Sequence, residues 1–284
     1  MRPAIGRRRP SAKRSNCGGV ARRVEIVAAL AVLIGLGFLI PGAAVLARAA
    51  SARQPQERLG AIQASTTRRL VLGHSVDGRP IIAWLIAPSR VWCSMLVVGS
   101  IAGDEPGGIA VTRFLVSQAP LAGVRLWLIP DVNPDGAVEE TRVNARGVDL
   151  NRNFSFRWRH QGVPGSRYYS GRRPASEPET RAIEAFIRRT RPGLAIWLHQ
   201  PYGLIDESQG PRWAEQRLAR ALKLPLERLP DYPGSGIGWD DHVIPRSAFD
   251  VELPGGGLSR PEIRRVAIAI RSLAQRFANG RAAD

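Results

Sequence analysis

Apolar stretches alternate with polar, turn-forming stretches along residues 67–284, and they follow two different periods. Apolar runs of about four to eight residues, bounded by Gly, Pro, Asp or Asn, predict buried strands. Longer runs with apolar residues three and four apart predict helices packed on a sheet. We expect strands within 68–73, 80–87, 94–100, 124–130, 193–201 and 247–255, and helices within 107–118, 176–192, 212–224 and 260–278.

Two boundaries in this pattern carry local signals. The segment 74–79, HSVDGR, places an Asp-Gly pair between two strand-like runs, which predicts a β-hairpin. Ser176, followed three residues later by Glu179, predicts a capping box at the start of a helix. Because strands alternate with helices, the sequence predicts an α/β fold with a mixed, mostly parallel twisted sheet and helices on both faces.

The first 66 residues differ in composition from the rest. Residues 1–25 are strongly basic, 26–47 are apolar and 48–66 are polar, so we expect a basic cytoplasmic leader, an apolar helix and a linker before a domain at 67–284. The apolar segment is long enough to span a bilayer, but its uninterrupted part, 26–40, has the length of a signal-peptide core. We therefore expect export, either as a secreted protein or with residues 26–47 as a membrane anchor.

The net charge of +17 is a candidate signature of nucleic-acid binding, and its location decides what it means. Residues 1–49 hold nine of the 41 Lys and Arg residues and one of the 24 acidic residues, which leaves a net charge of +9 for the rest. That remainder has no Lys-rich stripe with interleaved aromatic residues. The composition therefore does not favour a nucleic acid as a partner.

Polar residues that could bind a metal or take part in catalysis lie at the ends of four predicted strands. Glu105 and the segment 131–135 each follow one strand, and His199 and Glu252 end two others. Open α/β sheets place ligand sites at the carboxyl ends of their strands, so we expect these four groups to converge on one cleft. A His and a carboxylate suit zinc ligation, and a second carboxylate suits a general base that activates water.

Seven motifs occur in order along the chain: GHSVDGRPI, GDEPGG, PDVNPDG, RVNARGVDLNRNF, YYSGRRPASEPET, LHQPYG and FDVELPGG. Together they resemble the zinc carboxypeptidase family, and within it the bacterial murein peptide amidase branch, over roughly residues 66–275. The resemblance implies a carboxypeptidase-like fold and one zinc ion. It also implies hydrolysis of an amide bond next to a free carboxylate in a peptide, for example a cell-wall peptide.

The zinc loop of that family has a His three residues before its Glu, and this chain departs from the pattern. Glu105 and His199 match the Glu and the distant His of the ligand set, but position 102 is Ala. A methyl group donates no lone pair and a catalytic zinc normally has three protein ligands, so we expect weaker zinc binding. The candidates that could complete the site are a water, Asp104, His74, His160 and His242.

The other matches to the family are complete. Asn151 and Arg152, in DLNRNF, match the pair that binds the terminal carboxylate of the substrate, a task that suits a forked guanidinium. Arg142 matches the Arg that stabilises the oxyanion of a tetrahedral intermediate, and Glu252 matches the general base and acid. Tyr232 lies where larger carboxypeptidases have a substrate-capping Tyr, but its spacing differs.

Three hypotheses of function follow. The first is an exported zinc peptidase or amidase of reduced or altered activity, and the second is an inactive family member that binds peptide carboxylates without cutting. The third is hydrolysis of small acylated amino acids on the same scaffold. Glu252 favours an enzyme, whereas Ala102 argues against one. Tyr168 and Tyr169 are expected to pack rather than to serve the site.

Overall fold

The computed structural model describes residues 66–207 and 210–282. The predicted leader, the apolar helix and nearly all of the linker lie outside the described residues. No helix within the described residues is long and apolar enough to cross a membrane. In chain order the elements are β1 Thr66–His74, β2 Pro80–Ala87, β3 Val91–Val98, α1 Gly107–Val116, β4 Gly123–Ile129, α2 Pro134–Val138, η1 Leu150–Arg152, α3 Pro178–Thr190, β5 Leu194–His199, β6 Tyr202–Asp206, α4 Arg212–Leu222, β7 Leu226–Glu227, α5 Gly236–Val243, β8 Ala248–Pro254 and α6 Arg260–Ala282.

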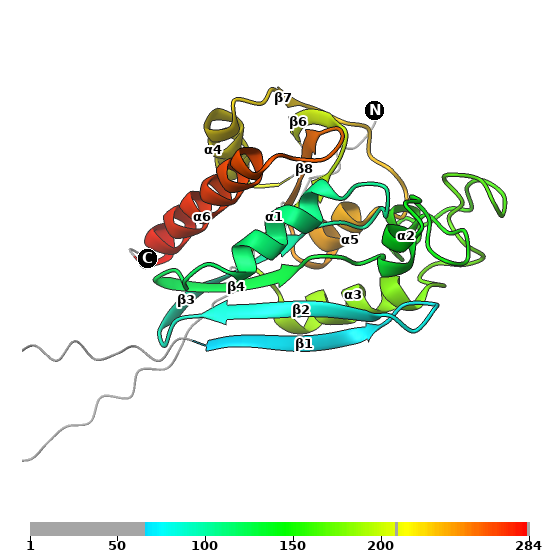
Figure 1. Cartoon of the computed structure of the whole chain (residues 1–284), viewed down its shortest axis with the longest axis horizontal. Coiled ribbons are helices and arrows are strands. Elements are labelled where there is room, and N and C mark those ends of the chain that lie inside the picture. Colours follow the sequence, from blue (N-terminus) through cyan, green and yellow to red (C-terminus); the bar gives the residue numbers. More distant parts are fainter. Residues whose placement is uncertain (1–65, 208–209, 283–284) are drawn as a thin grey trace, which may run out of the picture. The chain divides into compact units, whose positions relative to one another are not determined.

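An eight-stranded mixed sheet organises the described chain, in the order β1-β2-β4-β3-β5-β8-β6-β7 (Figure 1). The central strands β4, β3, β5 and β8 run parallel to one another. Antiparallel pairs join β1 to β2, β2 to β4 and β6 to β8. The predicted mixed, mostly parallel sheet is confirmed, with the parallel strands at its centre.

The hairpin predicted from the Asp-Gly pair forms between β1 and β2. The two strands pair antiparallel, with His74 opposite Pro80 at the turn. Gly78 has a φ of 80°, a left-handed conformation that strains residues with a side chain. Its N–H donates to the carbonyl oxygen of Ser75 at 3.0 Å and closes the turn. Local turn chemistry therefore fixes the register at this edge of the sheet.

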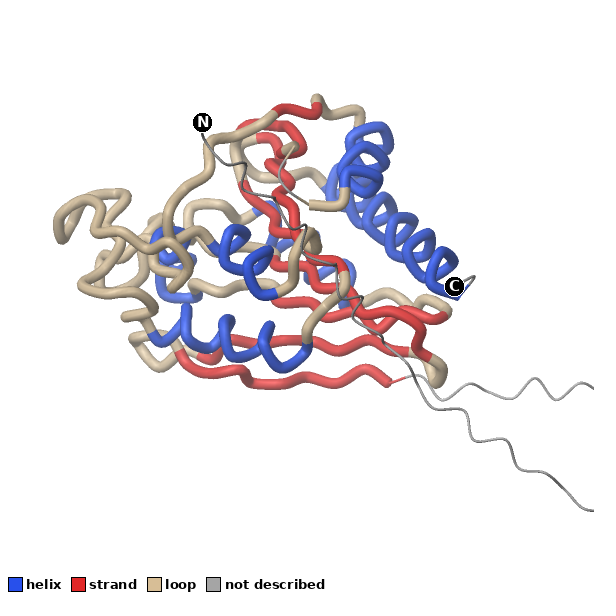
Figure 2. Tube along the Cα trace, turned by 180° about the vertical axis from the view of Figure 1, so that it is seen from behind, coloured by secondary structure: helices blue, strands red, loops and turns tan. Residues whose placement is uncertain are grey.

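Two hydrophobic clusters lie on opposite faces of the sheet, because successive strand residues point to opposite sides. In β3, Met95 and Val97 belong to the cluster with α1, α4 and α6, whereas Leu96 and Val98 belong to the cluster with α3 and α5. Figures 1 and 2 show these two groups of helices from the two sides of the molecule. The expectation of helices on both faces is confirmed.

The start of α3 differs from the expectation, and the predicted capping box is wrong. The helix begins at Pro178, and the preceding Glu177 makes no capping hydrogen bond with its side chain. Ser176 Oγ instead donates to Glu177 Oε1 at 2.7 Å and accepts from Asn153 Nδ2 at 2.9 Å. These contacts tie the start of the helix to the loop around Asn153. The pattern also did not predict β6, β7 and α5, which are short or rich in Gly.

Candidate functional site

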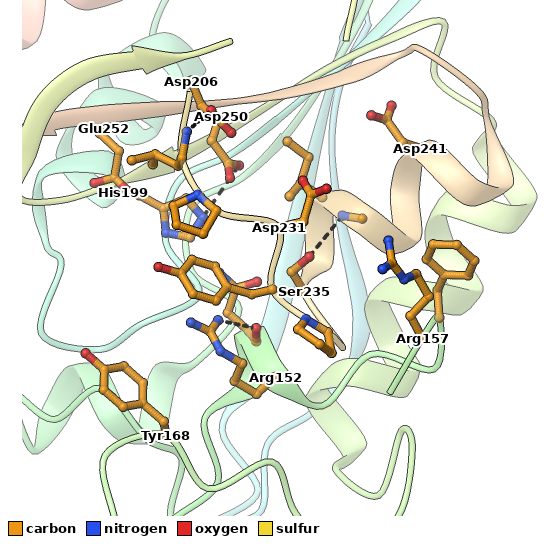
Figure 3. Close-up of a pocket in the computed structure, with 18 of the residues that line it drawn as sticks. Arg152, Arg157, Tyr168, His199, Asp206, Asp231, Ser235, Asp241, Asp250 and Glu252 are labelled. Atoms are coloured by element: carbon orange, nitrogen blue, oxygen red, sulfur yellow. Dashed lines mark hydrogen bonds and ion pairs between the residues drawn. The ribbon is translucent and has the colours of Figure 1, made fainter. Parts of the chain in front are cut away.

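A cavity of about 690 Å³ opens beside the carboxyl ends of β5 and β8. Those strands pair in parallel and place His199 opposite Glu252. Side chains from segments far apart in the sequence meet around this cavity (Figure 3). Six of the residues that the sequence singled out line it, namely Glu105, Arg142, Asn151, Arg152, His199 and Glu252.

The loop after β4 takes no part in this cavity, so the expectation for residues 131–135 is wrong. Asp135 accepts a hydrogen bond from Ser75 Oγ at 2.7 Å and pairs with Arg79 at 2.6 Å. It also accepts from the backbone N–H of Asp77 at 3.0 Å. Asp135 therefore fastens the loop to the β1–β2 turn, a structural task that leaves its carboxylate unavailable to the site.

Glu105 is buried, and both of its oxygens have partners. Its Oε1 accepts from Arg142 Nη1 at 3.0 Å, and its Oε2 lies 3.1 Å from His199 Nδ1 and accepts from the backbone N–H of Gln200 at 3.2 Å. Burial by itself would raise the pKa of Glu105, but the hydrogen bond with His199 and the charges of His199 and Arg142 lower it below its usual range. Glu105 is therefore a carboxylate held between the Arg142 guanidinium and the His199 ring.

His199 lies between carboxylates on its two sides. Its Nδ1 faces Glu105, and its Nε2 lies 3.7 Å from Asp250 Oδ1. Burial disfavours the charged imidazole, but Asp250 and Glu105, with a further contribution from Glu252, raise the pKa of His199 to about 9. This arrangement favours the protonated form of the ring.

Asp250 and Glu252 lie two residues apart in β8 and point to the same face of the sheet. Asp250 Oδ1 and Glu252 Oε2 are buried and make no hydrogen bond. Burial raises the pKa of Asp250 to about 7; His199 opposes this shift, and the carboxylates of Asp206 and Glu252 add to it. Burial also raises the pKa of Glu252, against the opposing charge of His199. Both carboxyl groups therefore hold a proton more readily than an exposed carboxyl.

Arg142 joins the predicted catalytic side chains to the loop that carries Arg152. Its Nε donates to Asp149 Oδ2 at 2.9 Å while its Nη1 donates to Glu105. Asp149 Oδ1 in turn accepts from the backbone N–H of Asn151 at 3.0 Å. Burial would lower the pKa of Arg142, but Asp149 and Glu105 raise it. The guanidinium is thus a fixed positive charge on the cavity wall.

Arg152 is only 6% exposed, and it makes no ion pair with any described residue. Its Nη1 donates to the carbonyl oxygen of Asn151 at 2.7 Å. Its guanidinium lies 4.0 Å from the ring centre of Tyr232 and 5.7 Å from that of Tyr168. Burial lowers the pKa of Arg152; the charge of Asp149 opposes that effect and the charge of Arg142 adds to it. The two rings hold this guanidinium, which has no ion-pair partner among the described residues, against the cavity.

The two tyrosines are the site residues that sequence analysis missed or discounted. Tyr168 does not pack in the core: it is 51% exposed and lines the cavity, as does Tyr232.

Asn151 is held by a loop contact of its own. Its Oδ1 accepts a hydrogen bond at 2.8 Å from the backbone N–H of Gly236, the first residue of α5. The sequence could not show these contacts, since they depend on how the loops fold over the sheet.

The residues at the family's zinc position do not fit a three-ligand site. Ala102 is 1% exposed and has no donor atom in its side chain. Asp104 Oδ2 pairs with Arg167 at 2.8 Å, while Asp104 Oδ1 is buried and makes no hydrogen bond. Across residues 66–207 and 210–282, no group of three or more His, Cys, Asp or Glu side chains could hold a metal ion. Only Glu105 and His199 of the expected ligand set are present.

The three other histidines are engaged elsewhere. His74 lies at the hairpin turn, opposite Pro80. The ring of His160 packs edge-on against Tyr169, with ring centres 6.0 Å apart. His242 lines the cavity, but its ring stacks on Phe156 at 4.0 Å. None of them joins Glu105 and His199 in a metal-binding group within the described chain.

Comparison with known proteins identifies the family to which the chain belongs. Residues 57–206 match the zinc carboxypeptidase family, Peptidase M14. The chain belongs to this family. It is 33% identical over 202 residues to murein peptide amidase A of Escherichia coli K12, an alignment that covers 66% of this chain and 80% of that protein. It is 29% identical over 201 residues to murein peptide amidase A of Vibrio campbellii, which covers 64% of this chain and 77% of that protein.

Solved structures support the same conclusion for the fold. The crystal structure of murein-tripeptide amidase from Escherichia coli O157 is similar with a TM-score of 0.63 and 28% identity, and covers 75% of this chain and 93% of that one. Carboxypeptidase A from Helicoverpa armigera is similar with a TM-score of 0.62 and 19% identity. The match covers 76% of this chain and 68% of that one. The expected carboxypeptidase-like fold is confirmed, and the family is one of zinc-dependent peptide hydrolases.

Proposed function

We propose that this protein binds peptides that end in a free carboxylate and does not cleave them by the zinc-dependent route of its family. One observation carries the proposal: the buried guanidinium of Arg152 lines the same cavity as the Glu105–His199 pair, beside which Ala102 supplies no ligand. The cavity thus contains the group that would bind a carboxylate. It lacks one of the donors that a catalytic zinc needs.

The state of Arg152 supports carboxylate binding. A buried guanidinium without an anion is costly, and a ligand carboxylate recovers the lost interaction through charge-assisted hydrogen bonds. Because Arg142 is already paired with Glu105 and Asp149, the ligand carboxylate would go to Arg152. Asn151 Oδ1 is occupied by Gly236, so the amide nitrogen of Asn151 is the donor it can offer to the same carboxylate.

Cell-wall peptides are the ligand class that we propose. Relatives of this chain are named murein peptide amidases. Carboxylates and guanidiniums both line the cavity, which suits a peptide that carries charges of both signs.

We also propose that the protein is exported. The basic segment 1–25 followed by the apolar segment 26–47 supports this, because such a pair directs the following chain across the membrane. Residues 1–66 fused to a phosphatase that folds only outside the cytoplasm should give an active reporter. An inactive reporter, with the fusion intact in the cytoplasm, would contradict export. Cell fractionation then separates a secreted product from an anchored one.

A second candidate function, weak peptide hydrolysis, is favoured by Glu252. Its Oε2 is buried without a hydrogen bond, and burial raises its pKa, a combination that suits a general acid or base. Under this hypothesis Glu252→Gln abolishes turnover and leaves ligand affinity near normal. Under the first hypothesis there is no turnover for the substitution to remove.

The test compares a peptide acid with its C-terminal amide by calorimetry on the purified full-length chain in mild detergent. Charge-assisted hydrogen bonds to Arg152 predict that the acid binds about 10–100-fold more tightly. Arg152→Ala should remove this preference, whereas Arg157→Ala, at an exposed Arg of the same cavity, should keep it. Chromatography of the peptide acid after incubation should show no cleavage. Equal affinity for acid and amide would overturn the proposal, and cleavage that depends on Glu252 would establish the second candidate.

A further inference from the structure

Helices α4 and α6 pack side by side on one face of the sheet (Figure 1). Trp213 of α4 stacks on Phe277 of α6, with ring centres 6.1 Å apart. One turn further along α4, Arg217 Nη2 donates to Ser272 Oγ of α6 at 3.3 Å. The two helices therefore present one continuous outer surface. We call it the α4–α6 face and define it as the exposed side chains of residues 212–223 and 260–280.

The α4–α6 face is strongly cationic. Residues 212–223 hold four Lys and Arg residues and 260–280 hold five, against one acidic residue in each segment. The acidic residue of α4, Glu215, is only 1% exposed and adds little to the surface. The acidic residue of α6, Glu262, lies in the first turn of the helix, where its charge interacts with Arg265. The face therefore carries a large excess of positive charge.

The arginines at the centre of the face have no ion-pair partner among the described residues. Arg217 and Arg220 are exposed on α4, and Arg264 and Arg265 are exposed on α6. Within residues 66–207 and 210–282, no carboxylate lies within 4.0 Å of any of these four guanidiniums. Arg212, at the edge of the face, does form an ion pair. Cations that lie together on a surface without counter-charges favour an anionic partner.

Two large apolar side chains lie among these arginines. Trp213 is 42% exposed and Ile268 is 55% exposed. Arg217 follows Trp213 by four residues on α4. Arg264 precedes Ile268 by four residues on α6, so each apolar side chain shares an outer helix face with an arginine. A Trp ring at the level of the lipid headgroups, with guanidiniums that reach the phosphates, is typical of a membrane interface.

The helix α3, on the opposite side of the sheet, lacks this combination. Its exposed Arg188 pairs with Glu184 at 3.8 Å and lies 4.9 Å from the ring centre of Trp239. No large apolar side chain of Pro178–Thr190 is exposed. Basic residues alone therefore do not distinguish the α4–α6 face. What distinguishes it is that arginines without ion pairs surround exposed apolar side chains.

The occupant that complements this face is an anionic lipid surface. A second copy of the chain would bring arginines against arginines in a two-fold contact, which like charges oppose. A soluble polyanion would leave Trp213 and Ile268 in water. Residues 26–47 are long enough to span a bilayer, and the 19 residues 48–66 reach at most about 65 Å. When that apolar segment is in a bilayer, the domain stays near the bilayer surface.

We propose that the α4–α6 face docks on a membrane that contains anionic lipid. The exposed guanidiniums of the face contact lipid phosphates, while Trp213 and Ile268 enter the headgroup region. No residue of the face lines the cavity, so the inference is independent of the proposed function. Failure of either one leaves the other standing.

The first test needs no variant and uses the full-length chain in bilayer discs of phosphatidylcholine, with or without phosphatidylglycerol. Phenylglyoxal modifies accessible arginines, and mass spectrometry gives the rate at each site. The rates at Arg264 and Arg265 should fall about fivefold in the anionic discs, as expected for a basic residue held at an anionic surface. Arg172 and Arg173, an exposed pair outside the face, are the matched control and should change by less than about twofold. Equal rates in the two kinds of disc, or equal protection of the control pair, would overturn the inference.

The second test asks whether the Trp213 ring enters the lipid. Brominated phosphatidylglycerol in the same discs quenches the fluorescence of tryptophans that contact it, and residues 1–65 contain no Trp. Trp213→Phe should remove most of the quenching. Trp92→Phe is the matched control, because Trp92 is 51% exposed but lies on β3, outside the face; it should keep the quenching. Undiminished quenching in Trp213→Phe, or an equal loss in the two variants, would contradict the proposed docking.

Inorganic polyphosphate tests the alternative occupant, a soluble polyanion. Added to phosphatidylcholine discs, it should protect Arg264 and Arg265 less than anionic lipid does. Protection as strong as that by phosphatidylglycerol, together with no quenching of Trp213 by the brominated lipid, would assign the face to a soluble polyanion and overturn the membrane proposal. A dimer in detergent that protects the same two arginines would assign the face to a second copy of the chain, and would overturn it as well.

Discussion

The two ends of the cavity differ in how many of the residues expected from the family are present. At one end Arg152 and Asn151 are present, and two tyrosine rings hold the guanidinium. At the other end Glu105 and His199 are present, but Ala102 stands where the third ligand would be. Under the proposed function, carboxylate binding and metal chemistry depend on separate side chains. A substitution at one end can therefore remove the chemistry and leave the binding intact.

The two ends also differ in how their charges are balanced. At the Glu105 end, Arg142 and His199 both contact the Glu105 carboxylate, although Asp250 Oδ1 and Glu252 Oε2 nearby make no hydrogen bond. At the other end Arg152 makes no ion pair with a described residue, and the charge of Asp149 acts on it from a greater distance. Removing one member of a buried ion pair leaves the other charge without its partner, whereas a charge without an ion pair that faces a cavity favours a ligand. Variants at the two ends should accordingly affect different measurements.

The largest expected effect is on stability at the Glu105 end. Arg142→Met removes the shared partner of Glu105 and Asp149 and leaves both carboxylates buried without it. Breaking a buried pair in this way costs about 3–5 kcal/mol, which denaturant unfolding would measure.

Arg167→Met is the matched control for that variant. Arg167 is more than half exposed, and its partner Asp104 is also partly exposed. Its loss should cost about 1 kcal/mol or less. Equal destabilisation by the two variants would show that the Glu105 network is no more important to the fold than a surface ion pair.

Asp240, a buried carboxylate outside the cavity, should make the stability of the fold depend on pH. Asp240 accepts from Trp197 Nε1 at 3.0 Å, and its Oδ1 makes no hydrogen bond. Burial raises its pKa to about 7, and nearby Asp241 adds to the shift. Because the folded state holds the proton more tightly than the unfolded chain, this group stabilises the fold at low pH. The stabilisation is lost as the pH rises through about 7.

Asp240→Asn tests that sign, since it keeps an acceptor for Trp197 and removes the titration. The wild-type free energy of unfolding should fall by an extra amount on the order of 2–4 kcal/mol between pH 4 and pH 8, relative to the variant, at 1.36 kcal/mol per pKa unit. Parallel pH profiles for the two proteins would contradict the raised pKa of Asp240. Denaturant unfolding at several pH values supplies both profiles.

The smallest expected effect concerns the rings at the Arg152 end. Tyr232→Ala removes a ring whose centre lies 4.0 Å from the guanidinium and should weaken binding of a peptide acid about two- to fivefold. Tyr232→Phe keeps the ring and should bind like the wild type. Equal losses for the two variants would assign the effect to the hydroxyl group rather than to the ring over Arg152. Calorimetry measures both affinities.

Much of the fold could be predicted because its signals are local. The Asp77-Gly78 pair determines a turn, and the apolar runs of β3 and β5 predict strands buried on both faces. The capping box predicted at Ser176 is wrong because the helix begins at Pro178. The Ser176 side chain makes hydrogen bonds with Asn153 and Glu177 instead. That competition between partners comes from tertiary structure, which the sequence does not display.

The candidate site was predictable where strand ends converge. His199 and Glu252 face each other because their strands are parallel neighbours, as the rule for α/β sheets implies. Asp250 could have been found from its position two residues before Glu252, on the same strand face. Asp206 could not, because its place depends on the antiparallel pairing of a strand that the pattern did not predict. The contacts of Tyr168 likewise depend on loop packing.

The most direct test of the central claim is zinc stoichiometry, measured on the full-length wild type and on Ala102→His, with hydrolysis of a wall tripeptide followed in both. The account predicts that the wild type holds far less than one zinc per chain, binds the peptide acid and leaves it intact. Restoring the third donor should raise zinc binding toward about one ion per chain. A wild type that retains about one zinc per chain and cleaves the tripeptide would contradict the account, whatever the variant does.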